Sequence, residues 1–127
     1  MAQLSQYAAL AAITGDQSGV EKMRQEFAAR ADLASRLLGQ IPHVTFCRPE
    51  GAFYMFFNVA AYFNKPLPIG RTVKNSMEFC QTALESKQLN FVPGSEFGAE
   101  GFIRMSYATS RSEIEAGLEQ LRQMLLG

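Results

Sequence analysis

The segment 18–38 is strongly amphipathic, and it constrains the fold more than any other part of the chain. Its apolar side chains recur every three or four residues, at Val20, Met23, Phe27, Ala31, Ala34 and Leu38. This spacing places them on one face of a helix about 30 Å long, which needs an apolar layer to pack against. Ser18 with Glu21 predicts a capping box at its start, and Gly39 and Pro42 predict its end.

Beyond Pro42 the pattern changes from helical to extended. Residues 43–47 and 52–58 predict two strands, joined by a turn at 48–51 in which Gly51 is expected to take a positive φ. The second strand has apolar side chains on both faces: Phe53, Met55 and Phe57 on one, and Ala52, Tyr54 and Phe56 on the other. A strand covered on one side only alternates with polar residues, so we expect both faces of this sheet to be covered.

Further elements are predicted on both sides of this pair of strands. An alanine-rich helix over 4–13 has so few polar side chains that we expect it to pack against something outside the chain. A short helical turn is predicted at 59–63. Asn75 with Glu78 predicts the start of another helix, whose expected inner face is Met77, Cys80, Ala83 and Leu84.

The C-terminal part predicts two more strands and a final helix. The strands are expected at 89–93 and 102–107, joined by a flexible glycine-rich turn at 94–101. Ser110 with Glu113 predicts the cap of the last helix, whose apolar stripe is Ile114, Leu118, Leu121 and Leu125. The element order predicts an α+β fold of two layers, with a small antiparallel or mixed sheet of about four strands packed with helices.

Charge and composition exclude several classes of function. The 127 residues fit one domain, and 12 basic residues balance 12 acidic ones, which disfavours nucleic acid or an anionic membrane as a partner. The longest strictly apolar run, 52–57, is too short to span a membrane. Cys47 and Cys80 are too isolated for a disulfide framework or, with His43 as the only histidine, a metal site. We expect both cysteines to be buried and reduced, in a soluble cytoplasmic domain.

Arg104 is the first candidate for a functional residue. In the strand 102–107, alternation assigns Ile103, Met105 and Tyr107 to the core face and Arg104 to the opposite face. A guanidinium there is either a solvated surface charge or a receptor for an anion, since its planar fork can bind a carboxylate with two parallel hydrogen bonds. The glycines of 94–101 match neither a phosphate-binding loop nor a GxSxG nucleophile turn.

Three motifs in fixed order resemble one known family. Residues 48–54, RPEGAFY, resemble the PEGAFY segment of class I aminotransferases of fold type I, close to the bacterial aspartate aminotransferase type. Residues 91–98, FVPGSEFG, and 102–110, FIRMSYATS, are similar to the VPGxxFG and RxSYA segments of the same enzymes. The resemblance covers nearly the whole chain.

The resemblance implies a particular part of such an enzyme. It identifies 18–127 as the C-terminal small domain and 1–17 as a helix leading in from a large domain of the same parent chain. The family binds pyridoxal phosphate on a large-domain lysine, and Lys22, Lys65, Lys74 and Lys87 all lie outside the motif of that lysine. The cofactor is therefore expected in the full-length parent and not on this chain, which is expected to contribute no catalytic residue and to be inactive alone.

The resemblance also assigns roles to two residues. Arg104 matches the arginine that binds the α-carboxylate of the substrate, which is an amino acid or a 2-oxo acid, and Phe53 would line the same cleft. The parent is expected to be a homodimer. From the residues alone, an alternative stays open: a free-standing α+β module that binds carboxylates for regulation, or docks a partner chain through its apolar faces.

Overall fold

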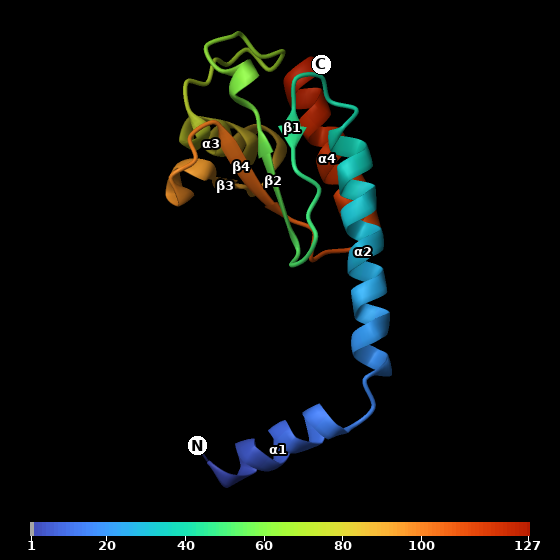
Figure 1. The fold of residues 1–127 in the computed structure, drawn as a ribbon. Helices are drawn as coiled ribbons and strands as arrows, with labels where there is room; N and C mark the ends of the chain where they lie inside the picture. Colours follow the sequence, from blue (N-terminus) through green and yellow to red (C-terminus); the bar gives the residue numbers. More distant parts are fainter. Residues whose placement is uncertain (1) are drawn as a thin grey trace.

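The computed structural model describes residues 2–127 and confirms the predicted α+β architecture (Figure 1). Its longer elements are α1 (Gln3–Thr14), α2 (Ser18–Leu38), β2 (Tyr54–Asn58), α3 (Ser76–Lys87), β4 (Phe102–Ser106) and α4 (Arg111–Leu126). The shorter ones are β1 (Thr45–Phe46), β3 (Val92–Pro93) and the 3-10 helices η1 (Ala60–Tyr62) and η2 (Gly94–Phe97). The strands form an antiparallel sheet in the order β1-β2-β4-β3.

One face of the sheet packs against α2, α3 and α4 and forms the core. The central strands contribute Met55, Phe57 and Ile103, all fully buried. The predicted stripe of α4 is confirmed, because Ile114, Leu118, Leu121 and Leu125 are all buried. The prediction that both faces are covered is wrong for this chain, since Tyr54 on the opposite face is 37% exposed. The helices within residues 2–127 pack on one side only.

The N-terminal part extends away from this core. The second half of the α2 stripe is buried, but Val20 and Met23 in its first half are 62% and 60% exposed, because the helix continues past the end of the sheet (Figure 1). Helix α1 confirms the predicted alanine-rich helix and has no buried residue. In Figure 1 it lies apart from the sheet and the other helices.

Two of the three predicted helix caps are confirmed. Asn75 Oδ1 accepts a hydrogen bond of 2.8 Å from the Glu78 N–H, and Ser110 Oγ accepts one of 3.2 Å from the Glu113 N–H. The capping box at Ser18 is wrong: α2 is preceded by Gln17, and the Ser18 hydroxyl donates to the Asp16 carboxylate. Asp16 also accepts from the Ser18 N–H at 3.0 Å, so it takes the place predicted for Ser18.

The outer strands are shorter than predicted, and the bend before β2 lies later in the chain. His43 and Ala52 have φ of 62° and 58°, which excludes both from an extended strand. The positive φ therefore falls on Ala52 and not on Gly51. Tyr107, the residue after β4, fixes this bend. It donates its N–H to the Phe53 carbonyl at 2.9 Å and its hydroxyl to the Ala52 carbonyl at 3.0 Å.

Three smaller predictions about burial are corrected. Met77 and Leu84 of α3 are about half exposed, and Phe79 is buried in their place. Cys47 is exposed, whereas Cys80 is buried as predicted.

Among residues 2–127, no helix is long and apolar enough to cross a membrane.

Candidate functional site

Arg104 lies in the middle of β4, on the face of the sheet opposite α2, α3 and α4. The alternation of β4 confirms the predicted faces, because Ile103 and Met105 are buried while Arg104 is half-buried. Antiparallel pairing sets Arg104 opposite Phe56 of β2 and Val92 of β3. Arg104 therefore lies on a central strand of the sheet, with β2 on one side and β3 on the other.

Two aromatic rings hold the guanidinium. Its Cζ lies 4.5 Å from the ring centroid of Tyr54 and 4.4 Å from that of Phe97. Tyr54 comes from β2, whereas Phe97 comes from η2, which follows β3, so the rings approach from opposite flanks of β4. Both distances lie within the range of favourable cation–π contacts.

No acid of the described chain competes for Arg104. Six arginines form ion pairs with carboxylates, at Arg24, Arg30, Arg48, Arg71, Arg111 and Arg122. Within residues 2–127, the guanidinium of Arg104 has neither an ion pair nor a hydrogen bond to the protein. Its five N–H donors are thus available to an external anion, for which a carboxylate is the best geometric match.

An aromatic surface surrounds this cation. Phe56 stacks on Phe102 with centroids 4.9 Å apart and ring planes 19° apart, and it meets Phe97 edge-on at 6.2 Å. Apolar rings beside a charge lower the local dielectric and strengthen its attraction for an anion. The site is therefore a cation in an apolar setting on an open sheet face.

The segment that carries Phe97 is fixed to helix α3. The Glu100 carboxylate accepts hydrogen bonds from the N–H and hydroxyl of buried Ser76, at 2.6 and 3.2 Å, and from the Gly101 N–H at 3.0 Å. These bonds stabilise the ionised form and hold the pKa of Glu100 below its usual value. The segment joins two antiparallel strands as predicted, but it forms η2 where a flexible turn was expected.

Phe53 lies near Arg104 without contacting its guanidinium. It is 40% exposed, and its ring centroid lies 4.6 Å from that of Tyr54 and 6.1 Å from that of Phe27 on α2. The structure therefore brings Phe53 against one of the two rings that hold Arg104. Sequence reasoning missed Phe97 and placed Tyr54 on a strand face that was expected to be covered. The only signal available was that both belong to the three motifs of the resemblance.

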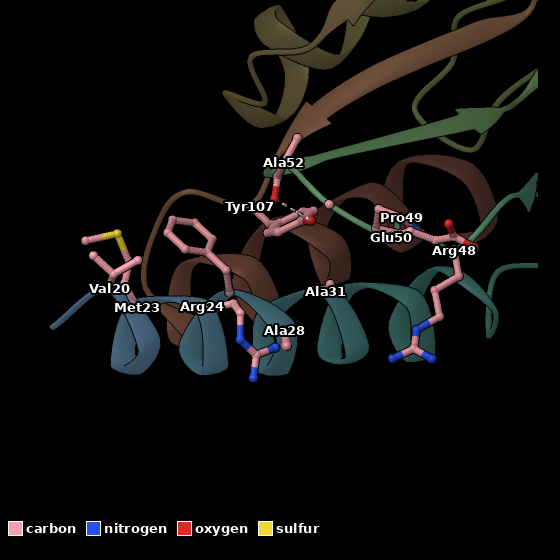
Figure 2. Close-up of a pocket in the computed structure, with 12 residues that line it drawn as sticks. Val20, Met23, Arg24, Ala28, Ala31, Arg48, Pro49, Glu50, Ala52 and Tyr107 are labelled. Atoms are coloured by element: carbon pink, nitrogen blue, oxygen red, sulfur yellow. Dashed lines mark hydrogen bonds between the residues drawn. The ribbon is translucent and has the colours of Figure 1, made fainter. Parts of the chain in front are cut away.

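A separate apolar groove of about 650 Å³ lies between α2 and the segment before β2 (Figure 2). It is lined by Val20, Met23, Arg24, Phe27, Ala28, Ala31, residues 48–52 and Tyr107. Arg104 does not line it, so the groove and the anion receptor are different features. The groove exists because the apolar stripe of α2 continues beyond the part of the helix that packs on the sheet.

The described residues do not form a site for pyridoxal phosphate. That cofactor needs a lysine amine beside its ring, and none of Lys22, Lys65, Lys74 and Lys87 lies on the strands and 3-10 helix that surround Arg104 or lines the groove. A metal site is not formed either, because residues 2–127 contain no cluster of three or more potential ligands. What the described residues present is a half-buried guanidinium beside two aromatic rings, with no acidic partner among residues 2–127.

Comparison with known proteins places the chain in one family. Residues 2–121 match the family described as aminotransferase class I and II, and the chain belongs to this family. It is 38% identical to an aspartate aminotransferase of Rhizobium meliloti over 93% of its length, and 41% identical to that of Geobacillus stearothermophilus over 96%. The chain spans only 29% and 30% of those two relatives.

Solved structures agree with the sequence relatives. The crystal structure of the aspartate aminotransferase from Rhizobium meliloti superimposes with a TM-score of 0.88 at 37% identity, over 94% of this chain and 30% of that one. The enzyme from Thermotoga maritima gives a TM-score of 0.78 at 34% identity, over 96% and 28%. The described fold thus corresponds to about three-tenths of an aspartate aminotransferase.

Proposed function

We propose that this chain is the C-terminal small domain of a pyridoxal-phosphate-dependent aminotransferase, of the aspartate type, and that Arg104 binds the α-carboxylate of its substrate. The observation that carries the proposal is the state of Arg104, which is half-buried, held between two rings and free of any protein acid. The family of the chain and the names of its relatives support the class of reaction.

The reaction of the parent is the exchange of an amino group between an amino acid and a 2-oxo acid. The cofactor supplies the electron sink for this exchange and is held by parts of the parent outside this chain. Arg104 contributes binding and orientation: two parallel N–H···O bonds to a carboxylate fix the direction in which the Cα of the substrate points. The comparisons give no support to a free-standing carboxylate-binding or interaction module.

The open sheet face and the exposed helix α1 fit a domain that is completed by the rest of its parent. We propose that residues 1–17 lead in from the large domain and that 18–127 form the small domain, since α1 has no buried residue while the second half of α2 does. We further propose a homodimeric, cytoplasmic parent. The resemblance supports the dimer, and the use of cysteine supports the compartment.

Substitution of Arg104 in the full-length parent tests the assignment. R104A removes charge-assisted hydrogen bonds worth about 1.5–3 kcal/mol, so we expect kcat/KM for amino-acid and 2-oxo-acid substrates to fall about 10- to 150-fold. R104K should lose most of the same activity, because an ammonium cannot reproduce the planar fork. R36A is the matched control, since Arg36 is exposed on α2 far along the chain from the site. Activity of R104A within twofold of that of R36A would reject the role.

The 127-residue chain itself tests the assignment of the cofactor. After incubation with pyridoxal phosphate and dialysis, we expect the chain to retain none of the cofactor, measured by its absorbance. Stoichiometric retention that depends on one lysine would show that this chain carries its own cofactor site and would contradict the proposal.

A further inference from the structure

The way in which Arg104 is held differs from the way in which the chain holds its six ion-paired arginines. Arg111, for comparison, donates from Nε and Nη2 to the two carboxylate oxygens of Glu26, at 3.1 and 2.6 Å. That ion pair uses the same edge of the guanidinium that a substrate carboxylate would need. Within residues 2–127 the guanidinium of Arg104 is paired with no carboxylate, and its Cζ lies 4.5 and 4.4 Å from the ring centroids of Tyr54 and Phe97.

An aromatic ring stabilises a guanidinium without occupying its donors. The ring attracts the cation through its quadrupole and covers a flat face, while every N–H group points outward in the guanidinium plane. A carboxylate at the same place would hold the side chain equally well but would block the ligand. The two rings come from different elements, Tyr54 from β2 and Phe97 from η2.

We infer that Tyr54 and Phe97 are positioning residues, which hold the guanidinium of Arg104 so that its open edge accepts a carboxylate. This inference rests on the proposed function of Arg104 and extends it to two residues whose rings act through the arginine. The ligand class is a planar carboxylate that approaches in the guanidinium plane. Phe97 reaches this position because Glu100 and Ser76 fix the segment that follows η2 to helix α3.

The experiment measures carboxylate binding and arginine mobility in the ¹⁵N-labelled 127-residue chain. The Nε–Hε resonance of Arg104 is followed during titration with sodium acetate, with sodium chloride added to keep the ionic strength constant. Y54L and F97L remove one ring each and keep an apolar side chain. Both positions are partly exposed, at 37% and 49%, so neither substitution opens a cavity in the core. F46L is the matched control, because Phe46 is a half-buried phenylalanine on β1, which β2 separates from β4.

We expect Y54L and F97L each to raise the acetate dissociation constant about two- to fivefold. This is the change in affinity that corresponds to the loss of one partly exposed cation–π contact. In the absence of acetate, the same variants should show a lower order parameter for the Arg104 Nε–Hε group. Y54F and F97Y keep the rings and should bind acetate as the unmodified chain does, as should F46L.

The possible failures separate the two claims. If Arg104 of the unmodified chain does not respond to acetate, the carboxylate site itself is wrong and the positioning role falls with it. If Arg104 responds but Y54L and F97L bind acetate as tightly as F46L, Arg104 remains the receptor and only the positioning role is overturned. A loss in Y54F equal to that in Y54L would assign the effect to the Tyr54 hydroxyl and overturn the role of its ring.

Discussion

Gly94, the first residue of η2, has no room for a side chain. A Cβ placed on it would lie 2.2 Å from the Ala99 carbonyl oxygen, 2.5 Å from the Phe102 carbonyl oxygen and 2.8 Å from the Phe102 Cβ. Two of these atoms belong to backbone that is itself held, since Ala99 N–H donates to the Gly94 carbonyl at 2.9 Å and Phe102 N–H to the Ala99 carbonyl at 3.2 Å. The substitution G94A therefore requires the backbone to move.

The expected cost of G94A is at least about 3 kcal/mol in the free energy of unfolding. Overpacking costs about 1–3 kcal/mol where side chains can give way, and here the nearest two atoms are carbonyl oxygens. That loss is a large fraction of the roughly 5–15 kcal/mol that stabilises an ordinary domain. Because η2 carries Phe97, the displacement should also weaken the contact between that ring and Arg104.

Two other glycines provide matched controls for this substitution. A Cβ on Gly51 or Gly98 would meet no atom within 4 Å, but Gly98 has a φ of 70°. G51A should therefore change stability by less than about 1 kcal/mol, and G98A should cost about 1–2 kcal/mol from backbone strain alone. Urea unfolding followed by far-UV circular dichroism gives the free energies of unfolding of the unmodified chain and of the three variants by linear extrapolation. A G94A protein within about 1 kcal/mol of G51A would refute the steric argument.

Three further predictions concern charge, thiol reactivity and the core. Glu26, which accepts hydrogen bonds from Arg111, has its pKa lowered to about 2 from 4.5, so its stabilising effect is present above pH 4.5 and is lost as the pH falls toward 2. The difference in unfolding free energy between E26Q and the unmodified chain should accordingly shrink from pH 7 to pH 2, and a constant difference would contradict the ion pair. Burial raises the pKa of Cys80 to about 12, so a thiol reagent should modify exposed Cys47 rapidly and Cys80 only in denaturant. Rapid modification of two thiols per chain without denaturant would refute this. F57A should lower the free energy of unfolding by about 3–5 kcal/mol in urea titrations, because Phe57 is fully buried, and a loss below 1 kcal/mol would show that the core had been misplaced.

The elements that sequence reasoning predicted well depend on interactions between near neighbours. The caps at Asn75 and Ser110 each join residues three positions apart, and the stripe of α4 repeats within a single helix. The cap at Ser18 was wrong because Asp16, two residues earlier, competes for the same N–H and hydroxyl. The local sequence pattern could not show whether the carboxylate of Asp16 or that of Glu21 accepts from the Ser18 N–H.

The site was predicted in part for the same reason. Period-two alternation was enough to put Arg104 on the face opposite Ile103, and the motifs gave it a role. Whether that face is open or covered depends on which layers the chain supplies, and here the helices cover only one side. The alternation of side chains within β2 could not show whether this face is covered, because Tyr54 and Phe56 are aromatic in either case.

The sequence by itself therefore determined the helices, the order of the elements, the two faces of β4 and the family. The tertiary structure alone decided that Tyr54 and Phe97 meet at Arg104, that only half of the α2 stripe is buried and that Arg104 has no acidic partner within residues 2–127. The reason is physical: periodicity and capping act within a few residues, whereas these contacts join segments far apart in the chain. The register of β2 against β4, and the path of the backbone after β3, set which side chains meet.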